Sequence, residues 1–185
     1  MAVKDIEKVD SIKQIIIYLM GPISVFINVL IANILFSYNL ISIISFNNII
    51  SLSIAMSLCN LLPIFPLDGY KALKSMLQIF IPYKKALKVS NIISLIAFTS
   101  FIFINFISFQ LTITLFLCFE QIKNLKNYKQ IYKRFLIYKT MNKKKKKFKM
   151  INDYQMFKDV NNYQIEKNKI LDDYDIATIE LKKYI

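Results

Sequence analysis

The chain of 185 residues contains no histidine, no tryptophan, two glycines and two cysteines. Without histidine it has no imidazole base to activate a serine or cysteine nucleophile and no imidazole ligand for a metal ion. Two glycines exclude a glycine-rich phosphate-binding loop. Cys59 and Cys118 lie in apolar segments without a paired spacing. The sequence therefore supports neither a disulfide framework nor a zinc site made of cysteines.

Charge is also missing from long parts of the chain. No charged side chain occurs among the 54 residues from Gln14 to Leu67, or among the 31 residues from Val89 to Phe119. A helix of about 20 apolar residues is long enough to cross the hydrocarbon core of a bilayer. With 55% hydrophobic residues and a mean hydropathy of +0.40, the chain is predicted to be an all-α protein, a polytopic bundle of transmembrane helices.

Three regions are predicted: a cytoplasmic N-terminal segment (1–13), a membrane domain (14–120) and a basic cytoplasmic tail (121–185). The predicted spans within the membrane domain are about 15–36, 41–62 and 89–119. Between the last two spans, the segment Lys71–Lys88 is amphipathic and basic, and its helical pattern ends at Pro82.

The distribution of lysines predicts the orientation. The loop before residue 89 is basic, and the tail carries 17 basic against 7 acidic residues. Short basic flanks stay in the cytoplasm, so both flanks of 89–119 and both termini are expected there. An even number of crossings follows, and we predict that 89–119 forms two short spans or a re-entrant hairpin. The turn is expected near Asn105–Gln110.

Asp68 is the first charged side chain after the 54-residue run. A charge inside hydrocarbon costs a few kcal/mol, so an acid in such a setting indicates a functional site. Pro63 and Pro66 each lack an amide donor and are expected to end the preceding helix just before the acid. Gly69 allows a tight turn or a close approach beside the carboxylate. We predict an unwound segment that presents one carboxylate to a polar pocket.

The pattern Asn-x-x-Pro-x-x-Pro-Leu-Asp-Gly is formed by Asn60, Pro63, Pro66, Leu67, Asp68 and Gly69. It resembles the second signature of the site-2 proteases, zinc metalloproteases that cut substrates inside membranes. In that family the Asp is the third zinc ligand, beside two histidines of an earlier His-Glu-x-x-His helix. The resemblance implies that Asp68 binds Zn²⁺ and that Asn60 positions the substrate backbone. It also implies that Pro63, Pro66, Leu67 and Gly69 shape the loop.

A second part of the resemblance lies in the first apolar run. Gly21, Pro22 and Asn28 fit the family's Gly-Pro followed by Asn in the helix after the His-Glu-x-x-His segment. The nearest branch is the one typified by the stage IV sporulation protein FB. The chain departs from the family at Tyr70, where a second glycine is usual, and in having no histidine at all.

These features lead to three interpretations. In the first, the chain is the C-terminal part of an intramembrane zinc metalloendopeptidase, inactive unless a separate N-terminal half supplies the His-Glu-x-x-His helix. Its substrate would be a membrane-associated protein. In the second, it is a pseudoprotease, a non-catalytic scaffold that binds transmembrane partners. In the third, it is an unrelated small anchor or transporter subunit, in which Asp68 binds an ion or a proton at a broken helix.

Five consecutive lysines mark the tail: Lys143, Lys144, Lys145, Lys146 and Lys147. Each lysine near an anionic bilayer surface contributes about 1 kcal/mol of attraction, so this run predicts attachment to membrane lipids. No fold motif of a nucleic-acid-binding protein accompanies it, and nucleic acid is not an expected partner. Residues 150–185 are weakly patterned and are expected to be partly helical or disordered.

Overall fold

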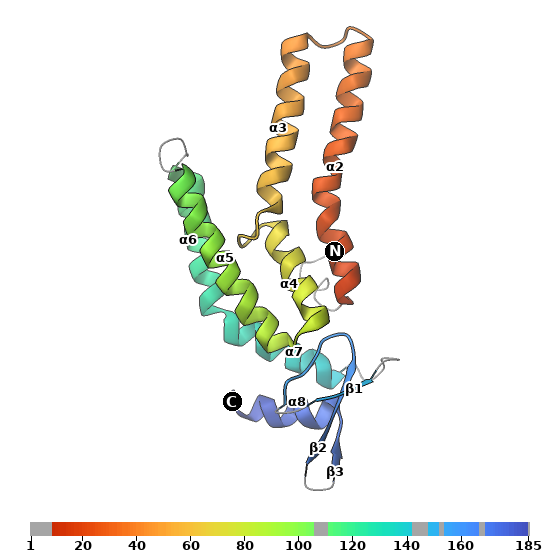
Figure 1. Cartoon of the computed structure of the whole chain (residues 1–185), viewed down its shortest axis with the longest axis vertical. Helices are drawn as coiled ribbons and strands as arrows, with labels where there is room; N and C mark the ends of the chain where they lie inside the picture. The colour runs from red at the N-terminus through yellow and green to blue at the C-terminus, as the bar shows by residue number, and fades with distance from the viewer. Residues whose placement is uncertain (1–8, 106–110, 142–147, 152–153, 167–168, 185) are drawn as a thin grey trace.

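A computed structural model of the chain describes residues 9–105, 111–141, 148–151, 154–166 and 169–184 (Figure 1). Its helices are α2 (Ser11–Ser37), α3 (Ile43–Leu61), α4 (Asp68–Phe80), α5 (Tyr83–Asn105), α6 (Leu111–Lys126), α7 (Tyr128–Met141) and α8 (Asp173–Lys182). Its strands are β1 (Phe148–Met150), β2 (Asn161–Glu166) and β3 (Lys169–Leu171). The mostly helical fold that the sequence predicts is confirmed, and the three strands are a departure from an all-α protein.

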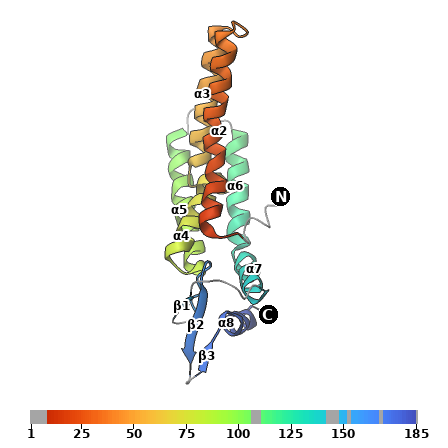
Figure 2. The ribbon, with the colours of Figure 1, turned by 90° about the vertical axis from the view of Figure 1, so that its right-hand side faces the viewer.

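Helices α2 and α3 form a long hairpin that extends beyond the other helices (Figures 1 and 2). α2 is continuous through Pro22. Ser42 is the N-cap of α3, and its side chain accepts a hydrogen bond of 3.2 Å from the Ser45 amide. Within the most apolar 18-residue stretch of each helix, 11% of the residues of α2 and none of those of α3 are buried. Their apolar surfaces are therefore left for lipid or another protein to cover.

Helices α2, α3 and α5 are each long and apolar enough to cross a membrane. α2 and α3 cover the first two predicted spans. The uncharged run 89–119 is divided between α5 and α6, which run in opposite directions (Figure 1). Residues 106–110, where the turn was predicted, are outside the described residues.

Helix α4 packs along α2 through polar side chains. The Ser75 hydroxyl donates to Gln14 Oε1 at 2.9 Å, and Ser11 Oγ lies 3.5 Å from Gln78 Oε1. All four side chains are buried. The exposed large apolar residues of α4 are Met76, Ile79 and Phe80. As predicted, the amphipathic pattern of 71–88 is interrupted at Pro82, and α5 begins at Tyr83.

The described part of the tail contains the helix α8, which agrees with the expectation of a partly helical segment, and it also contains three strands that the sequence did not predict. β2 lies between β1, which it pairs with in parallel, and β3, which it pairs with antiparallel. One core joins the tail to the start of α5: Tyr83, Leu87, Tyr132, Phe135, Leu136, Ile151, Met156, Ile176 and Ala177. These residues come from segments far apart in the chain, and a local sequence pattern does not reveal such a core.

A buried ion pair lies inside the tail. Lys139 Nζ is 3.1 Å from Asp173 Oδ2 and donates to the Val160 carbonyl at 2.6 Å. The other carboxylate oxygen of Asp173 accepts bonds from the Asn162 amide and side chain, at 2.9 and 2.7 Å. The lysine side chain is only 2% exposed. Each polar group is thus satisfied where α7, β2 and α8 meet, as a buried charge requires.

Glu180 of α8 connects the tail to α5. Its carboxylate accepts hydrogen bonds from Lys84 at 3.1 Å and from Lys183 at 2.6 Å. Burial alone would raise the pKa of Glu180, but the bonds from Lys183 and Lys84 outweigh it and lower the pKa. Glu180 is therefore held in its charged form against the first turn of α5.

Candidate functional site

The predicted break before Asp68 is present. α3 ends at Leu61, residues 62–67 form no regular helix, and Asp68 is the first residue of α4. Within the break the Leu67 amide donates to the Ile64 carbonyl at 2.8 Å, and the Phe65–Pro66 peptide bond is cis. A carboxylate in the first turn of a helix is favoured by the partial positive charge of the free amides there. The prolines thus place the acid at a helix N-terminus.

The Asp68 carboxylate contacts two other parts of the candidate site. Its Oδ1 accepts a bond of 2.9 Å from Lys71 Nζ, one turn further along α4. Its Oδ2 lies 3.1 Å from where a Cβ would stand on Gly21 of α2. The missing side chain of Gly21 therefore leaves the space that the carboxylate occupies. Lys71 Nζ also lies 5.6 Å from the centre of the Tyr18 ring, within range of a cation–π contact.

Two roles were predicted for Gly69, a tight turn and a close approach beside the carboxylate, and the structure supports the second. Its φ is not positive, so it is not required for a turn. A Cβ at Gly69 would stand 2.5 Å from the Leu62 carbonyl oxygen, and closer still to the carbonyl group of Leu61. Gly69 thus permits the close approach of α4 to the end of α3, which was the other prediction.

The remaining motif residues lie around the break. Asn60 is the next-to-last residue of α3 and is half-buried, as are Pro63 and Pro66. Leu67 packs with a small cluster made of Ile64, Phe98 and Leu117. In α2, by contrast, Asn28 is exposed, so only the Gly21 part of that motif meets the acid. The Asn33 side-chain amide donates to the Val29 carbonyl within α2 at 2.9 Å.

Behind the break lies a buried polar network that sequence reasoning did not identify. Asn91 Oδ1 accepts bonds from the Tyr70 hydroxyl at 2.6 Å and from Asn124 Nδ2 at 2.9 Å. The Ser94 hydroxyl accepts from the Phe65 amide at 2.9 Å. These bonds connect the break and α4 to α5 and α6. They also give Tyr70, the departure from the family pattern, a structural partner.

A signal for this network exists in the sequence. Asn91 and Ser94 of α5 are three residues apart, and so are Gln121 and Asn124 of α6. Residues at this spacing lie on one face of a helix. All four are buried, and Gln121 Nε2 donates to Ser94 Oγ at 2.5 Å. Two polar pairs at helical spacing, at the ends of the uncharged run, indicate helices that hydrogen-bond to each other.

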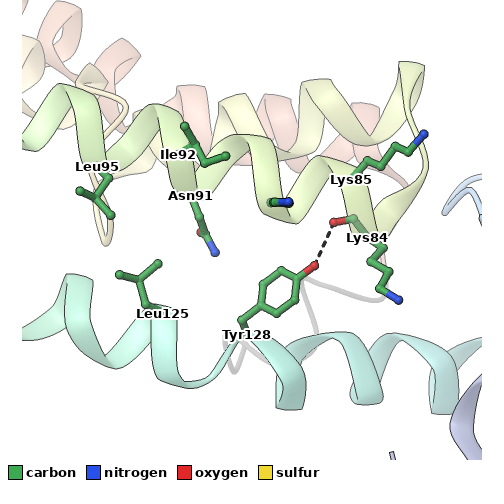
Figure 3. Close-up of a pocket in the computed structure, with 8 residues that line it drawn as sticks. Lys84, Lys85, Asn91, Ile92, Leu95, Leu125 and Tyr128 are labelled. Carbon is green, nitrogen blue, oxygen red and sulfur yellow. Dashed lines mark hydrogen bonds between the residues drawn. The ribbon is translucent and has the colours of Figure 1, made fainter. Parts of the chain in front are cut away.

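Two cavities lie near these helices, and Asp68 lines neither. The smaller, of about 240 Å³, is lined by residues of α2, α4, α6 and α7 and by Phe65. It is basic, since Lys71, Lys74, Lys123 and Arg134 line it with Glu120 as the one acid. The larger, of about 570 Å³, lies between α5 and the α6–α7 junction (Figure 3). A polar pocket for the Asp68 carboxylate stays a prediction; the carboxylate pairs with Lys71, which lines the smaller cavity, and lies against Gly21 of α2.

The residues of this chain do not by themselves fit a zinc ion. A catalytic zinc site takes three protein ligands, most often histidines and carboxylates. The chain has no histidine, and the described residues contain no group of three His, Cys, Asp or Glu side chains that could hold a metal ion. Asp68 is the single candidate ligand at the break, and one of its oxygens is paired with Lys71. This segment can therefore supply one carboxylate ligand, and the remaining ligands of a zinc ion would come from elsewhere.

The lysine run 143–147, predicted to attach to lipid, is outside the described residues. Comparison with models of known protein families found no match to this chain. Comparison with curated proteins found none either.

Proposed function

We propose that this chain is the membrane-embedded, Asp-bearing part of a site-2-type intramembrane metalloprotease, and that another segment supplies the His-Glu-x-x-His helix. One observation carries the proposal. The Asp68 carboxylate lies directly over Gly21, so two motifs that resemble the same family, and are distant in the sequence, meet in space. Alone, the chain has neither the remaining ligands nor a general base, and it is inactive as a protease under this proposal.

The proposed membrane placement follows from apolar length and lysine distribution. α2 and α3 cross the bilayer, α5 and α6 form two short spans or a re-entrant hairpin, and the tail with both termini lies in the cytoplasm. Asp68 then lies within the helical region of the membrane domain, one turn before Lys71. A lysine beside a carboxylate lowers the cost of placing both in a low-dielectric region. The ion pair thus stabilises the acid until a further segment packs against it.

The motif residues have distinct roles in this proposal. Asn60 lies in the last turn of α3 beside the break and offers an amide to the backbone of an extended substrate. Pro63 and Pro66 keep residues 62–67 out of the helix, and Gly69 lets α4 begin directly against α3. The exposed apolar faces of α2 and α3 are the surfaces on which the segment with the histidines would pack.

The experiment is purification of the chain from its native membranes through a C-terminal affinity tag, with identification of every polypeptide segment that remains bound. We expect a His-Glu-x-x-His sequence, either covalently joined or associated, and proteolysis of a membrane-associated substrate that Asp68→Asn abolishes. Recovery of the chain without any such sequence would reject the proposal.

A second candidate is a non-catalytic scaffold that binds transmembrane partners. The observation that favours it is the ion pair of Asp68 and Lys71, which satisfies the carboxylate without a metal ion. Photo-crosslinking from Asn60 in native membranes tests this idea. A specific partner that is lost on Asp68→Asn or Asn60→Ala, in a preparation without a His-Glu-x-x-His segment, would favour the scaffold over the protease.

A further inference from the structure

The larger cavity changes character along α5. Lys84, Lys85 and Lys88 line one end of it, in the first two turns of the helix. Ile92 and Leu95 follow along the same helix, and Leu125 faces them from α6 (Figure 3). The groove is therefore basic at the end near the tail and apolar towards the interior of the proposed membrane domain.

We propose that this groove binds one anionic phospholipid, with the phosphate at the lysines and an acyl chain along Ile92, Leu95 and Leu125. A volume of about 570 Å³ is within the range of ligand-binding cavities. Basic pockets between transmembrane helices on the cytoplasmic side bind anionic lipid head groups, because positive charge and apolar surface meet at the depth where phosphate and acyl chain join. The inference rests on the proposed membrane placement and not on the proposed metal site.

The three lysines differ in how free they are to bind phosphate. Lys84 Nζ is bonded to Glu180 and lies 5.1 Å and 5.7 Å from the Tyr132 and Tyr184 rings. Lys85 and Lys88 are exposed, and neither forms an ion pair with another residue that the structure describes. The phosphate is therefore bound mainly by Lys85 and Lys88.

Tyr128 forms one wall of the groove at the α6–α7 junction. Its hydroxyl donates to the Lys84 carbonyl at 3.2 Å, and Figure 3 shows its ring between the lysines and Leu125. Tyrosine is enriched at the head-group level of bilayers, where an apolar ring and a polar hydroxyl are both accommodated. The ring therefore lies between α5 and the α6–α7 junction, at the level where the lipid phosphate would lie.

The test measures how much lipid the purified chain retains. The full chain is reconstituted in bilayers of phosphatidylglycerol and phosphatidylcholine and extracted in mild detergent, and native mass spectrometry counts the bound lipids. The Lys85→Gln/Lys88→Gln variant removes the phosphate contacts, and Leu95→Trp fills the apolar end without changing charge. Lys126→Gln/Lys129→Gln is the matched control, because these two lysines are exposed and do not line the groove.

We expect one phosphatidylglycerol per chain, with little phosphatidylcholine. Each lysine near the surface contributes about fivefold to affinity, so losing Lys85 and Lys88 should weaken retention roughly 25-fold. Leu95→Trp should weaken it as well, and the control pair should leave it unchanged. Equal effects of the two lysine pairs, equal retention of both lipids, or no retained lipid would each overturn the inference. Release of the chain from membranes by alkaline carbonate would instead contradict the membrane placement.

Discussion

The two glycines of this chain should respond very differently to the same substitution. In Gly69→Ala the new Cβ meets backbone carbonyl groups of Leu61 and Leu62, at 2.5 Å or less. Backbone cannot move aside as a side chain can, so α4 must shift away from α3. Overpacking of this kind costs about 3 kcal/mol, and the helix propensity of alanine returns about 1 kcal/mol. The expected net loss is about 2 kcal/mol in the free energy of unfolding.

Gly21→Ala is the matched comparison. Its new Cβ would stand 3.1 Å from Asp68 Oδ2, which belongs to a side chain that can rotate away. The expected change in stability is between zero and a gain of about 1 kcal/mol, since alanine also favours the interior of α2. Unfolding by sodium dodecyl sulfate in detergent micelles, followed by circular dichroism, measures both variants. If Gly69→Ala proves as stable as the wild type, or Gly21→Ala is the more damaging change, the close approach described here is incorrect.

Three further substitutions test other parts of the structure by the same unfolding assay. Lys139→Met leaves the Asp173 carboxylate buried without its cation, and a loss of about 3–5 kcal/mol is expected. Asn91→Leu removes an acceptor and leaves the Asn124 amide without its shorter bond, which should cost about 1–3 kcal/mol. Glu180 has a lowered pKa when folded, so its contribution is present above its ordinary value of 4.5 and is lost as pH falls through the folded pKa. Glu180→Gln should therefore be less stable at neutral pH and lose less stability on acidification than the wild type.

Each of these outcomes has a clear opposite. A loss below about 1 kcal/mol for Lys139→Met would mean that the ion pair is not buried in solution. An unchanged stability for Asn91→Leu would mean that the network behind the break is not formed. A Glu180→Gln variant with the same pH dependence as the wild type would contradict the contacts of Glu180 with Lys84 and Lys183.

The sequence was sufficient to predict the helical elements that depend on local chemistry. Long uncharged runs predicted α2 and α3, and Pro63 with Pro66 predicted the end of α3 before Asp68. Proline at position 82 correctly separated α4 from α5. These features follow from backbone hydrogen bonding and from hydrophobicity, which are properties of a short stretch of chain.

Contacts between distant residues could not be predicted in the same way. The tail core depends on Met156 and Ile176 meeting Tyr83, and no periodic pattern connects these positions. Likewise, the resemblance identified both Gly21 and Asp68 but not their contact. The pairing of Asp68 with Lys71 was accessible from their spacing of three in a helix, but it was not predicted.

The most direct test of the central claim is the zinc content of the chain purified from its native membranes, for the wild type and for Asp68→Asn. Glu120→Gln serves as the control, because this acid lies on α6, pairs with Lys123 and is not part of the Asn60–Gly69 motif. The account predicts zinc in the wild type and the control whenever a His-Glu-x-x-His segment is present, and its loss in Asp68→Asn. Zinc that remains bound in Asp68→Asn, or a His-Glu-x-x-His segment that co-purifies without zinc, would contradict the account.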